Sequence, residues 1–170
     1  MQPHRQPDGL RFLENLAYLV PGYQGYRQRS RRREEDAQLR ARVVRELREL
    51  LQAVDALHDQ WAVDATDAAC EQVYYRRLRL EAIAESLRCA PYRARGFFES
   101  ELVPESALEQ ILEADLLVLE DLSDARHCLE EIGLQATAPR DLASFFAPLD
   151  LQCDHLEGHL IMREKLLASV

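Results

Sequence analysis

One stretch of apolar residues at helical spacing, between positions 43 and 61, limits what this chain can fold into. Its apolar side chains recur at steps of four and three residues: Val43, Leu47, Leu50, Val54, Leu57 and Trp61. On an α-helix this spacing places them in one continuous stripe. Because so long a stripe must be covered by other helices, the sequence predicts a helical bundle.

Later segments carry matching stripes, which indicates where the other helices lie. We expect an all-α fold, in which short connections make successive helices alternate in direction as an antiparallel up-down bundle. Four main helices are predicted over residues 27–60, 67–89, 104–132 and from 139 onward, with a short N-terminal helix over 9–19. Pro148 should kink or split the last helix. Gly133 should end the third.

The size and composition of the chain favour one domain. Its 170 residues, 47% of them hydrophobic, suffice for a single core over residues 9–170, after a loose tail over 1–8. The four cysteines are scattered singly, so neither a disulfide framework nor a thiolate metal site is expected. No apolar run reaches the roughly 18 residues of a membrane span, and no signal peptide is evident. We therefore predict a cytoplasmic protein.

Five arginines stand within seven residues near the start of the first long helix: Arg27, Arg29, Arg31, Arg32 and Arg33. With a chain net charge of −9, this run leaves −14 on all other residues. The run can be a solvated helix face, paired through Arg31 with Glu34 and Glu35 and through Arg32 with Glu35 and Asp36. Alternatively, it can bind nucleic acid or an anionic membrane surface.

Two segments combine aromatic residues with turn signals. The first is Pro21-Gly22-Tyr23-Gln24-Gly25-Tyr26, whose glycines permit unusual backbone angles. The second is the loop over residues 90–103, which contains Tyr92, Phe97 and Phe98. In each segment the rings can pack on the end of the bundle or contact a partner.

Four short motifs are distributed along the chain: Leu19-Val20-Pro21-Gly22-Tyr23-Gln24-Gly25-Tyr26, Arg31-Arg32-Arg33-Glu34, Gly96-Phe97-Phe98 and Arg163-Glu164-Lys165-Leu166-Leu167. Together they resemble a family of small, uncharacterised bacterial and archaeal helical proteins. The resemblance implies a shared helical bundle. It implies no activity, cofactor or partner.

Alternation of helix direction predicts that the two aromatic segments and the arginine run meet at one end of the bundle. Tyrosine and arginine are enriched at binding hot spots, so this end is our site hypothesis for a protein partner or for self-association. Its members are Tyr23, Tyr26, Arg27, Arg29, Arg31, Arg32, Arg33, Tyr92, Arg93, Arg95, Phe97 and Phe98. Arg77 and Asp115 fall in the apolar stripes of the two helices that flank the 90–103 loop, at similar distances from it. This position predicts a buried structural ion pair between Arg77 and Asp115, with Arg76 as the substitute partner.

The sequence offers no specific motif for catalysis. Histidines near carboxylates occur at Asp55-x-x-His58, Asp124-x-x-His127 and His155-x-x-x-His159, but Asp55 and Asp124 point away from the apolar stripes. No Gly-rich phosphate loop follows a strand. We therefore expect no cofactor. A non-catalytic interaction or scaffold module ranks first, a protein that binds nucleic acid or an anionic membrane second, and a metal-dependent bundle enzyme third.

Overall fold

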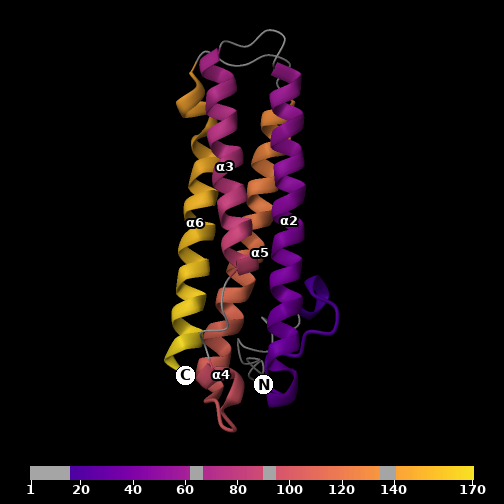
Figure 1. The fold of residues 1–170 in the computed structure, drawn as a ribbon, viewed down its shortest axis with the longest axis vertical. Coiled ribbons are helices and arrows are strands. Elements are labelled where there is room, and N and C mark those ends of the chain that lie inside the picture. The colour runs from indigo at the N-terminus through magenta and orange to yellow at the C-terminus, as the bar shows by residue number, and fades with distance from the viewer. Residues whose placement is uncertain (1–15, 62–66, 90–94, 135–140) are drawn as a thin grey trace, which may run out of the picture. The chain divides into compact units, whose positions relative to one another are not determined.

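The structure is a computed structural model, which describes residues 16–61, 67–89, 95–134 and 141–170. For residues 67, 89 and 95 only the backbone is described. The described residues contain helices and no strand, so the predicted all-α class is confirmed (Figure 1). The elements are the 3-10 helix η1 (Arg29–Arg31), α2 (Arg32–Trp61), α3 (Asp67–Cys89), α4 (Arg95–Glu99), α5 (Glu105–Gly133) and α6 (Leu142–Ser169).

The contacts of the chain divide it into two compact units. Unit 1 comprises residues 1–42, 91–119 and 159–170, and unit 2 comprises residues 43–90 and 120–158. Each of α2, α5 and α6 therefore contributes one stretch to unit 1 and another to unit 2.

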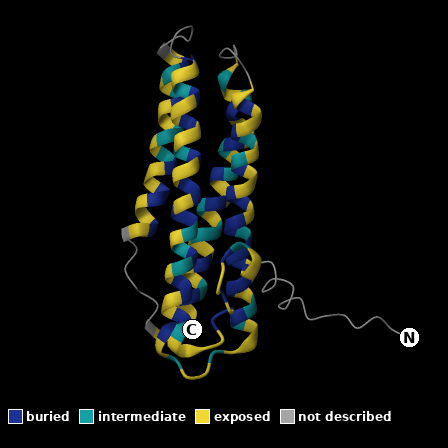
Figure 2. Ribbon diagram, turned by 90° about the vertical axis from the view of Figure 1, so that its right-hand side faces the viewer, coloured by how far each residue is buried: buried dark blue, intermediate teal, exposed yellow. Residues whose placement is uncertain are grey.

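Unit 2 contains the apolar stripe that the sequence singles out. Every member of the stripe from Val43 to Trp61 is buried, so the packing predicted for this helix is confirmed. Trp61, at the end of α2, lies against the rings of Phe145 and Phe146 of α6, with centroids 5.9 and 6.0 Å away. Figure 2 shows buried residues along one side of the helices and exposed residues along the other.

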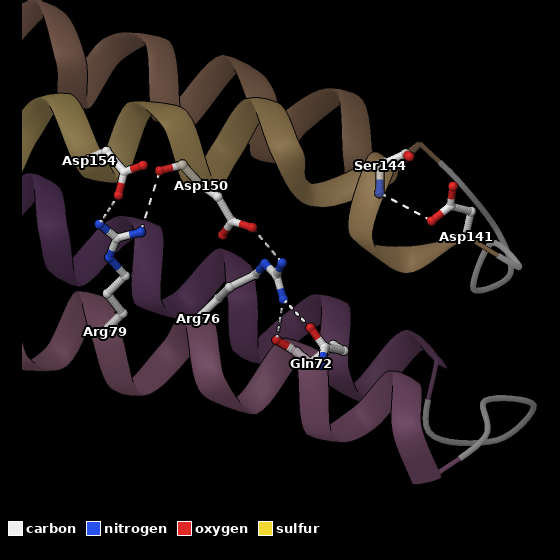
Figure 3. Close-up of polar contacts among 7 residues, drawn as sticks. All are labelled: Gln72, Arg76, Arg79, Asp141, Ser144, Asp150 and Asp154. Atoms are coloured by element: carbon white, nitrogen blue, oxygen red, sulfur yellow. Dashed lines mark hydrogen bonds and ion pairs between the residues drawn. The ribbon is translucent and has the colours of Figure 1, made fainter.

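Arginines of α3 join it to α6 within unit 2. Arg76 donates to Asp150 Oδ2 at 2.6 Å, and its guanidinium lies 4.1 Å from the centre of the Phe146 ring. One turn further on, Arg79 donates to Asp154 Oδ1 at 2.6 Å (Figure 3). Because the paired positions rise together along both helices, α3 and α6 run in the same direction.

The ends of the helices follow the local signals in most places. Asp141 accepts a hydrogen bond from the backbone N–H of Ser144 at 3.2 Å and so caps the start of α6 (Figure 3). Gly133 ends α5 as expected. Pro148 lies inside α6 and does not split it, while the predicted kink stays a prediction. Within the described residues, no helix is both long and apolar enough to cross a membrane.

Two predictions of helix boundaries were wrong. The long helix α2 begins at Arg32 rather than at residue 27, and η1 precedes it. Part of the expected loop over residues 90–103 is the short helix α4. The residues just before α2 include charged arginines, and Gly22 and Gly25 favour a turn. The spacing of apolar residues therefore gives no signal for the residue at which α2 begins.

Candidate functional site

The turn over residues 21–26 has a backbone conformation that most residues avoid. The φ angles of Gly22, Gly25 and Tyr26 are 86°, 73° and 59°. Glycine adopts such angles freely, whereas for tyrosine they cost about 1–2 kcal/mol. Glu35 of α2 holds the conformation, because one of its carboxylate oxygens accepts the backbone N–H groups of Gln24 and Tyr26 at 3.2 and 2.8 Å.

Both tyrosines of this turn bind one buried carboxylate, that of Asp115 on α5. The hydroxyls of Tyr23 and Tyr26 donate to Asp115 Oδ2 at 2.6 and 2.8 Å. The Nε of Arg163 on α6 donates to the other oxygen, Oδ1, at 2.5 Å. Asp115 has no exposed surface, and this burial raises the pKa of its carboxyl, while the three donors oppose that shift.

Arg163 extends this cluster to α2. Its Nη2 donates to the hydroxyl of Tyr26 at 2.9 Å and to Asp36 Oδ1 at 2.8 Å. Arg40 contacts the second oxygen of Asp36 at 2.8 Å. We name the set Tyr23, Tyr26, Asp36, Asp115 and Arg163 the buried polar network. It ties the N-terminal turn, α2, α5 and α6 together inside unit 1.

Arg32 links the same turn to α4 through backbone carbonyl groups. Its Nε donates to the carbonyl of Tyr26 at 2.9 Å, and its Nη1 donates to those of Phe97 and Ser100 at 2.9 and 2.7 Å. The Phe97 ring meets the Tyr26 ring edge to face, with centroids 5.3 Å apart. The prediction that the two aromatic segments lie together is therefore confirmed.

The meeting of these segments forms a core and not an exposed aromatic surface. Tyr23, Tyr26, Phe97 and Phe98 are each at most 5% exposed, so their rings are covered by unit 1 itself. Of the other aromatic and arginine members of the site hypothesis, Tyr92 and Arg93 lie outside the described residues. Arg95 is the first residue of α4, and only its backbone is described.

The arginine run splits into one buried and four accessible side chains. Arg32 is buried among backbone carbonyls. It does not form the pairs with Glu35 and Asp36 that the sequence suggested. The four others each contact a carboxylate: Arg27 with Glu105 at 3.7 Å, Arg29 with Glu101 at 3.3 Å, Arg31 with Glu34 at 3.7 Å and Arg33 with Glu99 at 3.1 Å. These carboxylates balance the charge of the run and weaken its attraction for phosphate groups.

The predicted Arg77–Asp115 pair is wrong. Arg77 donates to Asp55 of α2 at 2.8 Å and to Glu81 of α3 at 2.9 Å, and it belongs to unit 2. Asp115 belongs to unit 1 and takes Arg163 instead. Counting residues from the loop that joins two helices gives the position of each residue along the helix axis. It does not show which neighbouring helix the side chain faces. Arg76, the proposed substitute, binds Asp150.

Sequence reasoning missed Arg163 as a member of the buried polar network, although a signal for it exists. The apolar stripe of α6 includes Leu156, Leu160 and Leu167, and Arg163 occupies the position between the last two at the same spacing. A charged residue in such a stripe is buried with a partner or strongly destabilising.

The hydroxyls of the network should resist ionisation as long as the protein is folded. Burial raises the pKa of Tyr23 and Tyr26 well above the usual value of 10, and the Asp115 carboxylate raises both further. Because these pKa values are higher in the folded than in the unfolded state, their contribution to stability is complete below about pH 10 and is lost as the pH rises above it. Absorbance at 295 nm should therefore show these two tyrosines ionising only when helical circular dichroism disappears.

A substitution checks that this late ionisation comes from the buried hydroxyls. Tyr23→Phe removes one of the two and should therefore reduce the absorbance change that accompanies unfolding. Ionisation of all tyrosines in the folded protein would contradict the buried arrangement.

A second feature lies in unit 2, where α2 and α5 leave an open groove of about 350 Å³. It is lined by Glu49, Leu50, Ala53, Ala56, Leu57 and Gln60 of α2 and by Arg126, Leu129, Glu130 and Gly133 of α5. Ala53, Ala56 and Gly133 are exposed, and these small residues leave the space that larger side chains would fill. We name this feature the α2–α5 groove.

The groove has an apolar base and a charged rim. Leu50, Leu57 and Leu129 are buried beneath it. On the rim, Arg126 contacts both Glu46 and Glu49, the latter at 2.7 Å. Leu134, which follows Gly133 at the end of α5, is 83% exposed. An apolar base beneath a polar rim is the arrangement found at grooves that bind amphipathic helices.

The described residues offer no metal centre, because they contain no group of three or more His, Cys, Asp or Glu side chains that could hold an ion. Asp55, from one of the histidine motifs, binds Arg77 instead. Comparison of the chain with protein-family models, with curated proteins and with solved structures finds no match.

Proposed function

We propose that this protein is a non-catalytic helical interaction module, which binds a protein partner through the α2–α5 groove. The groove is the observation that supports the proposal: small residues on two adjacent helices leave an apolar depression open to solvent. The buried polar network is less suited to binding, since its hydroxyls, carboxylates and guanidinium satisfy one another.

The dimensions of the groove favour a helix over a small molecule. Its α2 residues Glu49, Ala53, Ala56 and Gln60 follow the helical steps of four, three and four. At a rise of about 1.5 Å per residue, they span roughly 16 Å, or three turns of a helix. A small ligand is usually enclosed on most sides, whereas the exposed alanines leave one side open. Leu134 at its end adds an apolar contact.

The proposal places the partner away from the arginine run. Each accessible arginine of the run has a carboxylate beside it, which competes with a phosphate for the guanidinium. Cytoplasmic location remains part of the proposal. It is supported by the free thiols of Cys70, Cys128 and Cys153, which fit a reducing compartment.

Site-specific photo-crosslinking in the native cell tests this function. A photoreactive residue replacing Ala53 should give a discrete adduct with another protein, identifiable by mass spectrometry, and Ala56→Trp should abolish it. The matched control is the same replacement at Ala82, an exposed alanine on α3 of the same unit, which should give no adduct. Equal adducts from both positions, or none from Ala53, would contradict binding in the groove.

A further inference from the structure

The charge of the chain is distributed very unequally between its two units. Unit 2 contains 18 acidic and 8 basic residues, a net charge of −10. Unit 1 has a net charge of +1, although it contains the arginine run. The negative charge of the protein is thus concentrated in the unit that forms the α2–α5 groove, and it should attract cationic partners.

The rim of the groove carries a net negative charge, as unit 2 does. Glu49 and Glu130 lie on opposite helices along the groove. The rim guanidinium, that of Arg126, is already shared between Glu46 and Glu49. Among the charged residues that line the groove, the carboxylates of Glu49 and Glu130 therefore outnumber the one cation. A ligand with carboxylates of its own would meet repulsion there, whereas lysine or arginine side chains would find partners.

From the proposed function together with this charge, we infer that the occupant of the α2–α5 groove is a basic amphipathic helix of a partner protein. Its apolar side chains, spaced by three and four residues, lie over Ala53, Ala56 and the exposed Leu134. Its lysine or arginine side chains reach Glu49 and Glu130 at the rim. About three turns of helix match the length of the groove.

Synthetic peptides with defined charge test the inference by fluorescence anisotropy on the full chain. The probe is a labelled 14-residue peptide with leucines at helical spacing and lysines at the other positions. The first comparison peptide keeps the leucines and has glutamates in place of the lysines. The second keeps the lysine composition but scrambles the leucines. The basic amphipathic peptide should bind at least tenfold more tightly than either.

Two kinds of variant separate the apolar contact from the charge. Ala53→Trp and Ala56→Trp should weaken binding of the basic peptide at least tenfold, while Ala82→Trp on α3 should change it less than twofold. Glu130→Lys should weaken binding several-fold and increase binding of the acidic peptide, whereas Glu71→Lys, at an exposed site of the same unit, should do neither. Circular dichroism of each variant verifies that it is folded.

Each possible failure has a distinct meaning. If the acidic peptide binds as tightly as the basic one and Ala53→Trp abolishes both, the inferred charge is wrong and the groove still binds helices. If the scrambled basic peptide binds as tightly as the amphipathic one, charge alone attracts it and the inference is overturned. An absence of any peptide binding that depends on Ala53 or Ala56 also overturns it. Crosslinks from Ala53 would then decide whether the proposed function survives.

Discussion

Replacing Arg163 by methionine should lower the free energy of unfolding by about 3–5 kcal/mol. The substitution leaves the carboxylates of Asp115 and Asp36 buried without the guanidinium that contacts both. It also removes a donor to the hydroxyl of Tyr26. Urea unfolding followed by circular dichroism would measure the loss. Thermal unfolding should show a midpoint lower by about 6–20 °C for a chain of this size.

Arg88→Met is the matched control for this result. Arg88 also contacts a carboxylate, that of Glu85 at 3.0 Å, but both side chains are more than half exposed. Surface pairs of this kind contribute at most about 1 kcal/mol. Equal losses for the two variants would mean that the buried polar network does not stabilise the fold as its geometry indicates.

Phe97→Ala should also cost about 3–5 kcal/mol, because it leaves a cavity beneath α4. The ring has no exposed surface and packs against Tyr26 and Phe98, with centroids 5.3 and 5.2 Å away. The guanidinium of Arg32 lies 5.4 Å from its centre and loses this contact as well. Chemical denaturation would measure the loss of stability.

The matched control for Phe97 is Leu102→Ala. Leu102 follows in the same segment but is 89% exposed, so its truncation should change the stability by less than about 0.5 kcal/mol.

Binding of the partner shows whether the aromatic segment has a purely structural role. If it has, the Phe97→Ala variant, studied under conditions in which it is folded, should still form the crosslink from Ala53. A variant of unchanged stability that no longer binds its partner would instead place Phe97 in the binding surface.

Apolar spacing was sufficient to predict the helices and much of the core. The stripe from Val43 to Trp61 is buried throughout, and α3 and the end of α5 fall where turn signals and spacing indicate them. This success has a simple cause, since each helix must bury one face and the choice of that face depends only on local spacing.

The same method failed where charged residues occupy the buried face. Moving back from Leu39 in steps of three and four leads to Asp36 and Arg32, both of which are buried. Because these residues are polar, apolar spacing gave no sign that this face of α2 is buried. Apolar periodicity cannot distinguish an exposed charge from one whose partners come from distant parts of the chain.

Pairing between distant helices was also beyond the sequence. The position of Asp115 within an apolar stripe correctly marked it as a buried charge. Its partner could not be chosen, because Arg77 and Arg163 both fit an apolar spacing and only the arrangement of helices decides between them. The α2–α5 groove was missed for a related reason: a space left by Ala53, Ala56 and Gly133 exists only once two helices are packed.

The contacts of the buried polar network join residues that are far apart along the chain, which bears on the order of folding events. Tyr23 and Asp115 are 92 residues apart, and Tyr26 and Arg163 are 137 apart. Closing such long loops costs entropy, and contacts of this range slow folding, whereas a hairpin of neighbouring helices can assemble early. The network should therefore form late and act chiefly as a barrier to unfolding. Arg163→Met would then accelerate unfolding and leave the refolding rate nearly unchanged.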